Sequence, residues 1–253
     1  MNIYEFGKQN PDILLMFHGA CMYWNMYEEA IGILAEHFHV VIPALPGHDP
    51  DTDENFTSVE QIDAEIEDWL LAREVHTITC LYGLSMGGGL ALRFLADQRI
   101  SVYQAIIDGG MTPYQLPWIL TRFIALRDYL MVQIGRHSKR ILAAAFPPEK
   151  FTPEGVDYIF QILRHMNAKT VWNVFDSCNN YSLPNPLPNM QTKLEYWYGE
   201  HEKKARAWDI VYVKQHYPNI RFREIPGVDH GEYCMMHQKE FAADVIAVAC
   251  KVK

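Results

Sequence analysis

Short apolar runs of strand length alternate with helical patterns along most of the chain, and this alternation constrains the fold more than any other feature. Six runs fit strands: "ILLMF" (13–17), "VVI" (40–42), "TITCLY" (77–82), "YQAIID" (103–108), "LEYWY" (194–198) and "FREI" (222–225). Several are apolar on both faces, which is typical of buried parallel strands. The pattern predicts an α/β fold in which helices cover both faces of a mostly parallel sheet.

Helical patterns fall between these runs, at about 24–36, 57–72, 86–97, 204–216 and 232–249. The second of them begins with Thr57 and Glu60 in the spacing of a capping box. We therefore expect Thr57 to cap this helix.

Residues 111–188 interrupt the alternation. This stretch has helical patterns, no convincing strand and eight prolines. We expect a helical cap over residues 111–188, inserted into one core domain made of residues 1–110 and 189–253. A chain of 253 residues is long enough for one such domain with a sizeable core.

Charge and cysteine content exclude several classes of protein. The formal net charge is −9 and charges of both signs are scattered, so no basic stripe suits a nucleic acid. Five widely spaced cysteines with no C-x-x-C pair indicate reduced thiols and neither a disulfide framework nor a zinc site. His37 and His39 would share one face of a strand but have no third ligand close in sequence. We expect no metal and no other cofactor.

One stretch, "LPWILTRFIALRDYLMVQIG" (116–135), approaches the length of a membrane span. Arg122, Arg127 and Asp128 interrupt it, so we interpret it as an amphipathic helix and expect no membrane span. The beginning of the chain, "MNIYEFGKQNPD", lacks the basic start and the apolar segment of a secretory signal. The expected location is therefore cytoplasmic.

The strongest chemical signal is "GLSMGG" at 83–88, between a predicted strand and a predicted helix. Ligands of open parallel sheets bind beyond the carboxyl ends of the strands, where Ser85 falls. A G-x-S-x-G turn strains the serine backbone, and Gly83 and Gly87 provide the side-chain-free neighbours that it needs. At the helix N-terminus, the Met86 N–H would favour developing negative charge. The alternative is a glycine-rich turn that only packs the helix on the sheet.

A serine hydroxyl needs a base, and the base needs a third group to orient it. His230, in "IPGVDHGEY", follows the last predicted strand and should lie at the same edge of the sheet. The preceding strand ends in a glycine turn that carries Glu200 and Glu202, of which we select Glu202. The alternatives are a histidine in a surface loop and solvated acids in the first turn of the next helix.

An early loop, within "MFHGACMYW", offers a second donor for an oxyanion. It follows a strand, its Gly19 lets the backbone turn close to a substrate, and the Ala20 N–H would then face the serine. His18 is expected to be a structural, hydrogen-bonding histidine, because only His230 follows the acid in chain order.

With serine, acid and histidine in this order, the sequence resembles the α/β-hydrolase superfamily, and within it the serine esterases and lipases with a helical cap. "HGA", "GLSMGG", "YGEHE" and "DHGEY" each fall at the matching strand end, and the resemblance covers nearly the whole chain. It implies that Ser85 attacks an acyl carbon, His230 relays the proton and Glu202 orients His230. It also implies that the amides of Ala20 and Met86 form the oxyanion hole.

The chain departs from the family pattern at three places. Many relatives carry aspartate where this chain has Glu202, and some place the acid after the strand that ends at Asp108. Asp108 is therefore the alternative acid, unless it is a strand-end aspartate that bonds loop amides. The loop "PALPGHDP" has Ala44 where many members have aspartate and Asp49 where a second glycine is usual, so its conformation is left open.

The resemblance implies a serine hydrolase that cleaves a small-to-medium carboxylic ester, or a thioester, through an acyl-enzyme on Ser85. Alternatives are a carbon–carbon bond hydrolase or cofactor-independent lyase with the same triad, and a small-ligand binding protein that retains the triad. The partner would be a small ester or acyl substrate, and an apolar edge of the cap offers a homodimer contact. Large side chains of the cap are expected to line an acyl or aryl pocket or to form the cap's own core: Trp118, Phe123, Tyr129, Met131, Phe146, Phe160 and Trp172.

Overall fold

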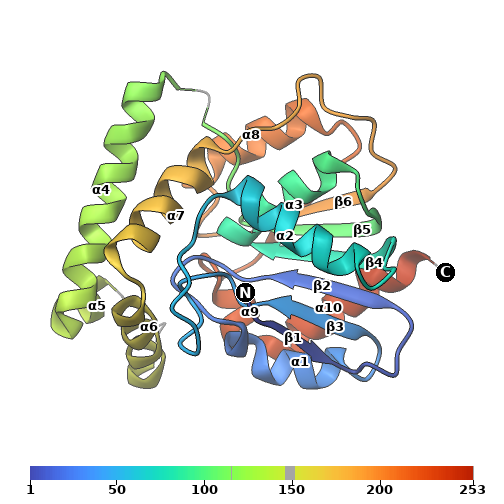
Figure 1. The fold of residues 1–253 in the computed structure, drawn as a ribbon, viewed down its shortest axis with the longest axis horizontal. Helices are drawn as coiled ribbons and strands as arrows, with labels where there is room; N and C mark the ends of the chain where they lie inside the picture. Colours follow the sequence, from blue (N-terminus) through green and yellow to red (C-terminus); the bar gives the residue numbers. More distant parts are fainter. Residues whose placement is uncertain (115, 146–151, 253) are drawn as a thin grey trace.

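The computed structural model describes residues 1–114, 116–145 and 152–252 (Figure 1). One sheet of seven strands has the order β1-β3-β2-β4-β5-β6-β7. The strands are β1 (Ile3–Phe6), β2 (Ile13–Phe17), β3 (His39–Pro43), β4 (Thr77–Leu84), β5 (Ser101–Asp108), β6 (Lys193–Gly199) and β7 (Arg221–Ile225). All neighbouring strands are parallel except β1, which pairs antiparallel with β3.

Helices connect the strands and cover both faces of the sheet (Figure 1). They are η1 (Trp24–Tyr27), α1 (Glu28–Leu34), α2 (Val59–Leu71), α3 (Met86–Asp97), α4 (Trp118–His137), α5 (Lys139–Ala145), α6 (Pro153–His165), α7 (Ala168–Asn180), α8 (Ala207–His216), α9 (Glu232–Met236), α10 (Gln238–Ala249) and η2 (Cys250–Val252). The predicted α/β class with a mostly parallel sheet is thus confirmed.

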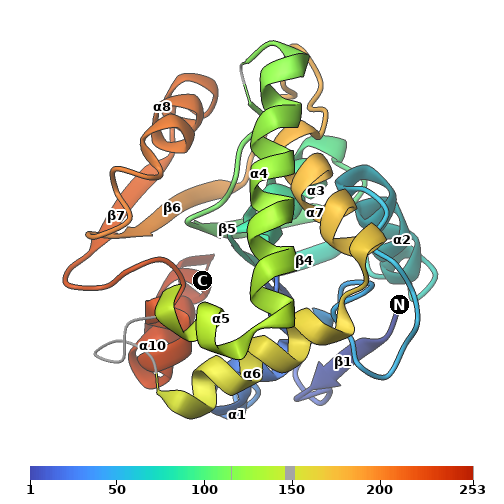
Figure 2. The ribbon, with the colours of Figure 1, turned by 90° about the vertical axis from the view of Figure 1, so that its left-hand side faces the viewer.

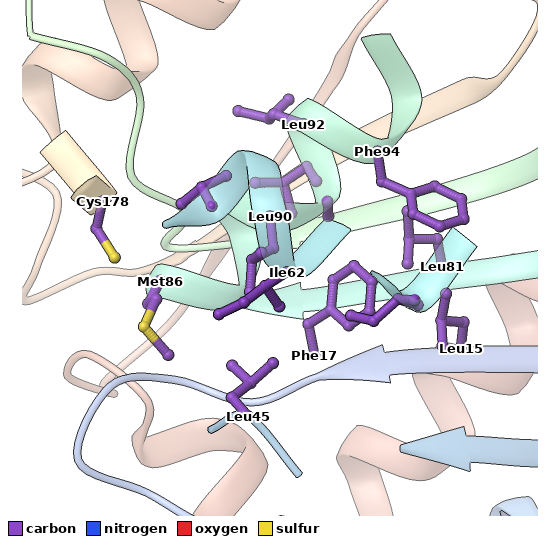
Figure 3. Packing of buried hydrophobic residues seen from close by; sticks show 14 of the residues in the cluster. Leu15, Phe17, Leu45, Ile62, Leu81, Met86, Leu90, Leu92, Phe94 and Cys178 are labelled. Carbon is purple, nitrogen blue, oxygen red and sulfur yellow. The ribbon is translucent and has the colours of Figure 1, made fainter. Parts of the chain in front are cut away.

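Two apolar cores, one on each face, hold this sheet. Leu15, Phe17 and Leu81 pack with residues of α2 and α3 on one face (Figure 3). Leu14 and Met16, the alternate residues of β2, belong to the core beneath α1 and α10 on the other face. Successive side chains of a strand point to opposite faces, so a strand buried on both faces must be apolar throughout.

β3 lies on one side of β2 and β4 on the other, so the chain adds strands in one direction up to β3 and in the opposite direction from β4 on. The register pairs Phe17 of β2 with Gly83 of β4, so both strands end at the same level. The loop after β2 and the start of α3 therefore emerge side by side at the carboxyl edge, which is where open α/β sheets bind ligands.

The six predicted strands are confirmed, each within two residues at either end. β1 was not predicted. The predicted cap of α2 is wrong, because Ser58 rather than Thr57 accepts the N–H of Gln61, at 3.2 Å. The helix predicted at 232–249 is divided into α9 and α10, with His237 between them.

Between β5 and β6 the chain forms α4 to α7, which we call the inserted helical region. Its helices lie beyond the carboxyl ends of the strands (Figure 1), and α4 is its outermost element (Figure 2). Tyr158 accepts the N–H of Tyr23 at 3.0 Å, and Asn179 accepts the N–H of Tyr114 at 2.9 Å, which anchors the region to loops that follow β2 and β5. None of the helices in the described part of the chain is long and apolar enough to cross a membrane.

Candidate active site

Ser85 occupies a strained turn between β4 and α3, with φ 54° and ψ −113°. Few residues other than glycine adopt such angles, and surrounding contacts must hold them in place. Two backbone hydrogen bonds do so here: the Ser85 N–H donates to the carbonyl of Asp108 at 2.8 Å, and the Ser85 carbonyl accepts the N–H of Met111 at 3.1 Å. The turn is thereby fixed to the end of β5.

The glycines around Ser85 allow α3 to begin against the end of β2. A Cβ atom at Gly87 would lie 2.4 Å from the carbonyl oxygen of Phe17, and one at Gly83 would lie 2.2 Å from that of Gly87. Any side chain at these two positions would push the helix away from the sheet. The local sequence therefore fixes both the strained serine and the short distance between α3 and the loop after β2.

The two predicted oxyanion donors lie on either side of this close contact. Ala20 belongs to the loop after β2, and Met86 is the first residue of α3. A Cβ atom at Gly19, the residue before Ala20, would lie 3.4 Å from Leu84 Cδ2, so this loop runs close to the end of β4. Within the described ranges, neither the Ala20 N–H nor the Met86 N–H donates a hydrogen bond to another protein group. Neither amide is therefore engaged in a bond that would conflict with the predicted role.

His230 and Glu202 form a close pair at the same edge. His230 Nδ1 lies 2.5 Å from Glu202 Oε2. The Glu202 side chain is only 3% exposed, whereas that of His230 is 35% exposed. Glu202 Oε1 also accepts the N–H of Gly199 at 2.9 Å, which fixes the carboxylate. With Nδ1 bound to a carboxylate, the other ring nitrogen, Nε2, is the one available for proton transfer.

Gly109 connects this pair to the serine. It has φ +53°, and a Cβ there would lie 2.8 Å from His230 Nδ1 and 2.9 Å from Glu202 Oε2. It directly follows Asp108, whose carbonyl accepts the Ser85 N–H. Ser85 and the His230–Glu202 pair therefore flank the same end of β5. No hydrogen bond joins Ser85 Oγ to His230 among the described residues, and such bonds are often long until a substrate is bound.

The other two candidate acids make different contacts. Glu200 is exposed and accepts the N–H of Gly227 at 2.9 Å. Asp108 is buried and accepts the hydroxyl of Tyr82 at 2.7 Å rather than the loop amides expected of a strand-end aspartate. Burial raises the pKa of Asp108 to about 6, although the Tyr82 hydrogen bond opposes this shift. Of the three carboxylates, Glu202 is the one that the structure brings into contact with His230.

Arg206 is a site residue that the sequence analysis missed. Its Nε lies 3.8 Å from Glu202 Oε2 and its Nη1 lies 3.3 Å from Asp209 Oδ2. The spacing of four residues from Glu202 was a usable signal, because residues four apart in a helical turn face the same side. Arg206, Gly199 and His230 together hold the Glu202 carboxylate.

A cavity of about 280 Å³ adjoins these residues. Met111, which binds the Ser85 carbonyl, and Arg206, which pairs with Glu202, both line it. Its other lining residues are Tyr114, Leu116, Ile124, Asn179, Ala205, Trp208 and Asp209. The cavity therefore lies between the inserted helical region and the start of α8, beside the candidate site.

His18 is buried and structural, as expected. Its Nε2 accepts the N–H of Leu45 at 3.1 Å and its Nδ1 donates to the carbonyl of Gly19 at 2.9 Å. Burial lowers the pKa of His18 to about 4, which keeps the ring neutral. Asp49, in the next loop, is also buried and accepts hydrogen bonds from the Tyr23 hydroxyl at 3.1 Å and the Asn2 amide at 2.9 Å. Asp49 thus stabilises this loop.

Several expectations for the large side chains of the inserted helical region are wrong. Trp118, Phe123 and Met131 are exposed and do not form a core of the region, because the side of α4 that packs on the protein carries smaller residues. Tyr129 and Trp172 stack edge to face with ring centroids 5.7 Å apart inside the region. Phe160 is partly buried, and Phe146 lies outside the described residues.

We assign no metal site in the described part of the chain. Across residues 1–114, 116–145 and 152–252, no group of three or more His, Cys, Asp or Glu side chains is arranged to hold one. The five cysteines, Cys21, Cys80, Cys178, Cys234 and Cys250, are free.

Comparison with known proteins identifies a family model, described as the alpha/beta hydrolase family, that matches residues 14–247. A comparison with curated protein sequences finds no match. Solved structures with the same fold include one from a study of carboxylesterases of Nitrososphaera gargenis, at 14% identity, with 100% of this chain and 96% of that chain covered and a TM-score of 0.77. MenH from S. aureus is 18% identical, with 99% and 97% covered and a TM-score of 0.77. A thermophilic esterase from Thermogutta terrifontis is 17% identical, with 99% and 93% covered and a TM-score of 0.73.

Proposed function

The chain belongs to the alpha/beta hydrolase family, and we propose that within it the protein is a serine hydrolase that cleaves a small-to-medium carboxylic ester through an acyl-enzyme on Ser85. The observation that carries this proposal is the 2.5 Å hydrogen bond between His230 Nδ1 and Glu202 Oε2. It lies at the end of β5 to which the strained Ser85 turn is also bonded. A nucleophile, a base and an acid that orients the base are then available at one edge of the sheet.

In the first half of the proposed reaction, Glu202 holds His230 with its Nε2 free to accept the proton of Ser85 Oγ. The Oγ attacks the acyl carbon, and the carbonyl oxygen becomes an oxyanion that accepts hydrogen bonds from the N–H groups of Ala20 and Met86. When the tetrahedral intermediate collapses, the bond to the alcohol breaks and His230 returns the proton to the leaving oxygen. Ser85 then carries the acyl group as an ester.

In the second half, a water molecule replaces the alcohol. His230 accepts a proton from this water, whose oxygen attacks the acyl carbon, and the same two amides stabilise the second oxyanion. Collapse of this intermediate releases the carboxylic acid and returns the proton from His230 to Ser85 Oγ. Glu202 stabilises the positive charge that His230 carries in both halves.

We further propose that residues 111–188 act as a cap domain that limits the size of the substrate. The cavity of about 280 Å³ between this region and the start of α8 is lined by Met111 and Arg206, which contact Ser85 and Glu202, and this supports a role for the region next to the site. Its apolar lining from the cap side, such as Leu116 and Ile124, suits an alkyl or aryl group.

A panel of p-nitrophenyl esters of increasing acyl length tests the proposal, with Ser85→Ala as the blank. We expect turnover of the shorter esters by the wild type and a loss of about 10⁴-fold or more in Ser85→Ala. A wild type no faster than Ser85→Ala on every ester would exclude an ester hydrolase.

The same panel separates the alternative functions when it is extended with acyl thioesters and combined with labelling of Ser85 by a fluorophosphonate. Normal labelling with poor turnover of both the p-nitrophenyl esters and the thioesters would indicate a carbon–carbon hydrolase or lyase. Rapid turnover of acyl thioesters but not of oxygen esters would indicate a thioesterase. Tight ligand binding with neither labelling nor turnover would indicate a binding protein.

A further inference from the structure

The outward side of α4 is apolar and packs against no other element within residues 1–114, 116–145 and 152–252. Figure 2 shows α4 running along the outside of the molecule, and Figure 1 shows nothing beyond it. Seven large apolar side chains on this helix are between 41% and 64% exposed. They are Ile119, Leu120, Phe123, Leu126, Leu130, Met131 and Ile134, and we call them the α4 face.

The packing of α4 explains why these side chains point outward. Thr121, Ala125 and Gly135 are its buried residues, and the helix packs on α5, α6 and α7. Such small residues let α4 lie close to its neighbours, so its large apolar residues are left on the opposite side. Trp118, at the first turn, is exposed as well. A continuous apolar strip of this kind exceeds the scattered apolar residues of an ordinary surface and marks an interaction site.

The charges around the α4 face are unlike those of the rest of the chain. α4 and α5 contain five Lys and Arg residues and one Asp, whereas the remainder of the chain contains 17 Lys and Arg against 30 Asp and Glu. Some of these cations are paired: Arg127 with Asp128, at 2.7 Å, and Arg122 and Lys139 with Asp residues of α7 and α6. Even with those two neighbouring Asp residues included, cations outnumber anions by five to three.

We propose that the α4 face docks on the surface of an anionic lipid bilayer, with its apolar side chains inserted at the level of the headgroups. Exposed aromatic and aliphatic residues flanked by Arg and Lys are the features of helices that lie in a membrane interface, and tryptophan is enriched at that level. A negative lipid surface complements the local excess of cations.

A second copy of the chain fits the same face less well, because a symmetric contact would bring two cationic surfaces together. The inserted helical region lies over the carboxyl ends of the strands, so lipid docking would turn the edge of the sheet that carries the candidate site toward the bilayer (Figure 1). Docking itself needs only the α4 face, so it does not depend on the proposed hydrolase function.

Sedimentation of the full chain with vesicles tests the proposal. The probes are vesicles of phosphatidylcholine alone and of phosphatidylcholine mixed with phosphatidylglycerol. We expect the protein to sediment with the mixed vesicles, to bind pure phosphatidylcholine more weakly and to be released by salt. Ser85→Ala should bind as the wild type does, which separates this test from that of the enzyme activity.

Variants of exposed residues identify the surface without disturbing the core. The double variant Phe123→Asp with Leu130→Asp should lower the partition coefficient at least about tenfold, because two apolar side chains no longer insert. Arg127→Glu with Arg140→Glu should weaken binding to the mixed vesicles only. Tyr103→Asp is the matched control, since Tyr103 is 51% exposed but lies near the amino end of β5, away from the inserted helical region. It should bind like the wild type.

Three results would overturn the proposal. One is a wild-type protein that stays in the supernatant with mixed vesicles at low salt. Another is a double variant of Phe123 and Leu130 that binds as tightly as the wild type. The third is a dimer, seen by light scattering, that the same double variant dissociates, because a second copy would then cover the α4 face.

Discussion

Replacing Gly109 with alanine should show how the reactivity of Ser85 depends on the position of the His230–Glu202 pair, separately from the stability of the fold. The new methyl group would lie 2.8 Å from His230 Nδ1 and 2.9 Å from Glu202 Oε2, well inside ordinary van der Waals contact at about 3.5–4.0 Å. The His230–Glu202 pair must therefore move by roughly 0.5–1 Å. A misplacement of about 1 Å in a catalytic group can cost about 10²-fold in rate. We expect Gly109→Ala to lose about that factor in the rate of fluorophosphonate labelling of Ser85.

The backbone strain of this substitution is measured separately by Gly227→Ala. Both glycines have positive φ, +53° at Gly109 and +72° at Gly227, so alanine should cost about 1–2 kcal/mol of stability at either position. A Cβ at Gly227 meets no atom within 4 Å. Thermal unfolding should therefore show the cost of backbone strain in both variants and a further loss in Gly109→Ala, whose methyl group also displaces its neighbours. Only Gly109→Ala should label slowly.

The reasoning would be refuted if Gly109→Ala reacted with the fluorophosphonate at the wild-type rate. It would also be refuted if Gly227→Ala slowed the reaction as much as Gly109→Ala, because strain alone would then explain the effect. Labelling rates are the appropriate readout, since they report the reactivity of Ser85 without knowledge of the natural substrate.

Three further predictions concern residues around the same site. Glu202→Gln should slow fluorophosphonate labelling of Ser85 by about 10³–10⁴-fold, while Glu200→Gln should leave the rate unchanged; equal losses would argue against Glu202 as the acid. Ser85→Gly should be more stable to thermal unfolding than Ser85→Ala, by about 1 kcal/mol of unfolding free energy, because glycine relieves the strained backbone; equal midpoints would contradict the strain. Burial raises the folded-state pKa of Asp108 to about 6, above its value of 3.8 in the unfolded chain. Between these two values the folded protein binds more protons than the unfolded chain, so Asp108 lowers the stability of the fold as the pH rises from about 4 to about 6. Urea unfolding across this range should show a smaller decline for Asp108→Asn, and an unchanged decline would exclude Asp108 as its source.

Much of the sheet could be predicted from sequence because its strands are buried on both faces and stand out as apolar runs. β1 could not, because it is a four-residue edge strand, "IYEF", of mixed polarity. Its pairing with β3 is decided by the tertiary structure. The cap of α2 could not be assigned either, since Thr57 and Ser58 are adjacent hydroxyl residues and only the backbone angles determine which one caps the helix.

The strained turn at Ser85 and the position of His230 at the same edge of the sheet could be predicted, because G-x-S-x-G is a local motif and His230 follows the last strand. The acid remained open because Glu200, Glu202 and Asp108 all follow strand ends, and the sequence does not show which carboxylate points at the histidine. The N–H of Gly199 orients Glu202 toward His230, and this is visible only in three dimensions.

The contacts of Gly109 and the orientation of α4 were also beyond the sequence. Gly109 meets residues that lie far away in the chain, so no local pattern reports its role. The periodicity of 116–135 indicated an amphipathic helix, but it did not show that the small residues, rather than Phe123 and Met131, would face the protein.

The most direct test of the proposed function is to map the fluorophosphonate adduct by mass spectrometry of peptides from the labelled protein. The proposal predicts one modified residue, Ser85, and no such adduct in Ser85→Ala. A wild-type protein that stays unmodified under conditions where a control esterase reacts would contradict it, as would undiminished labelling of Ser85→Ala.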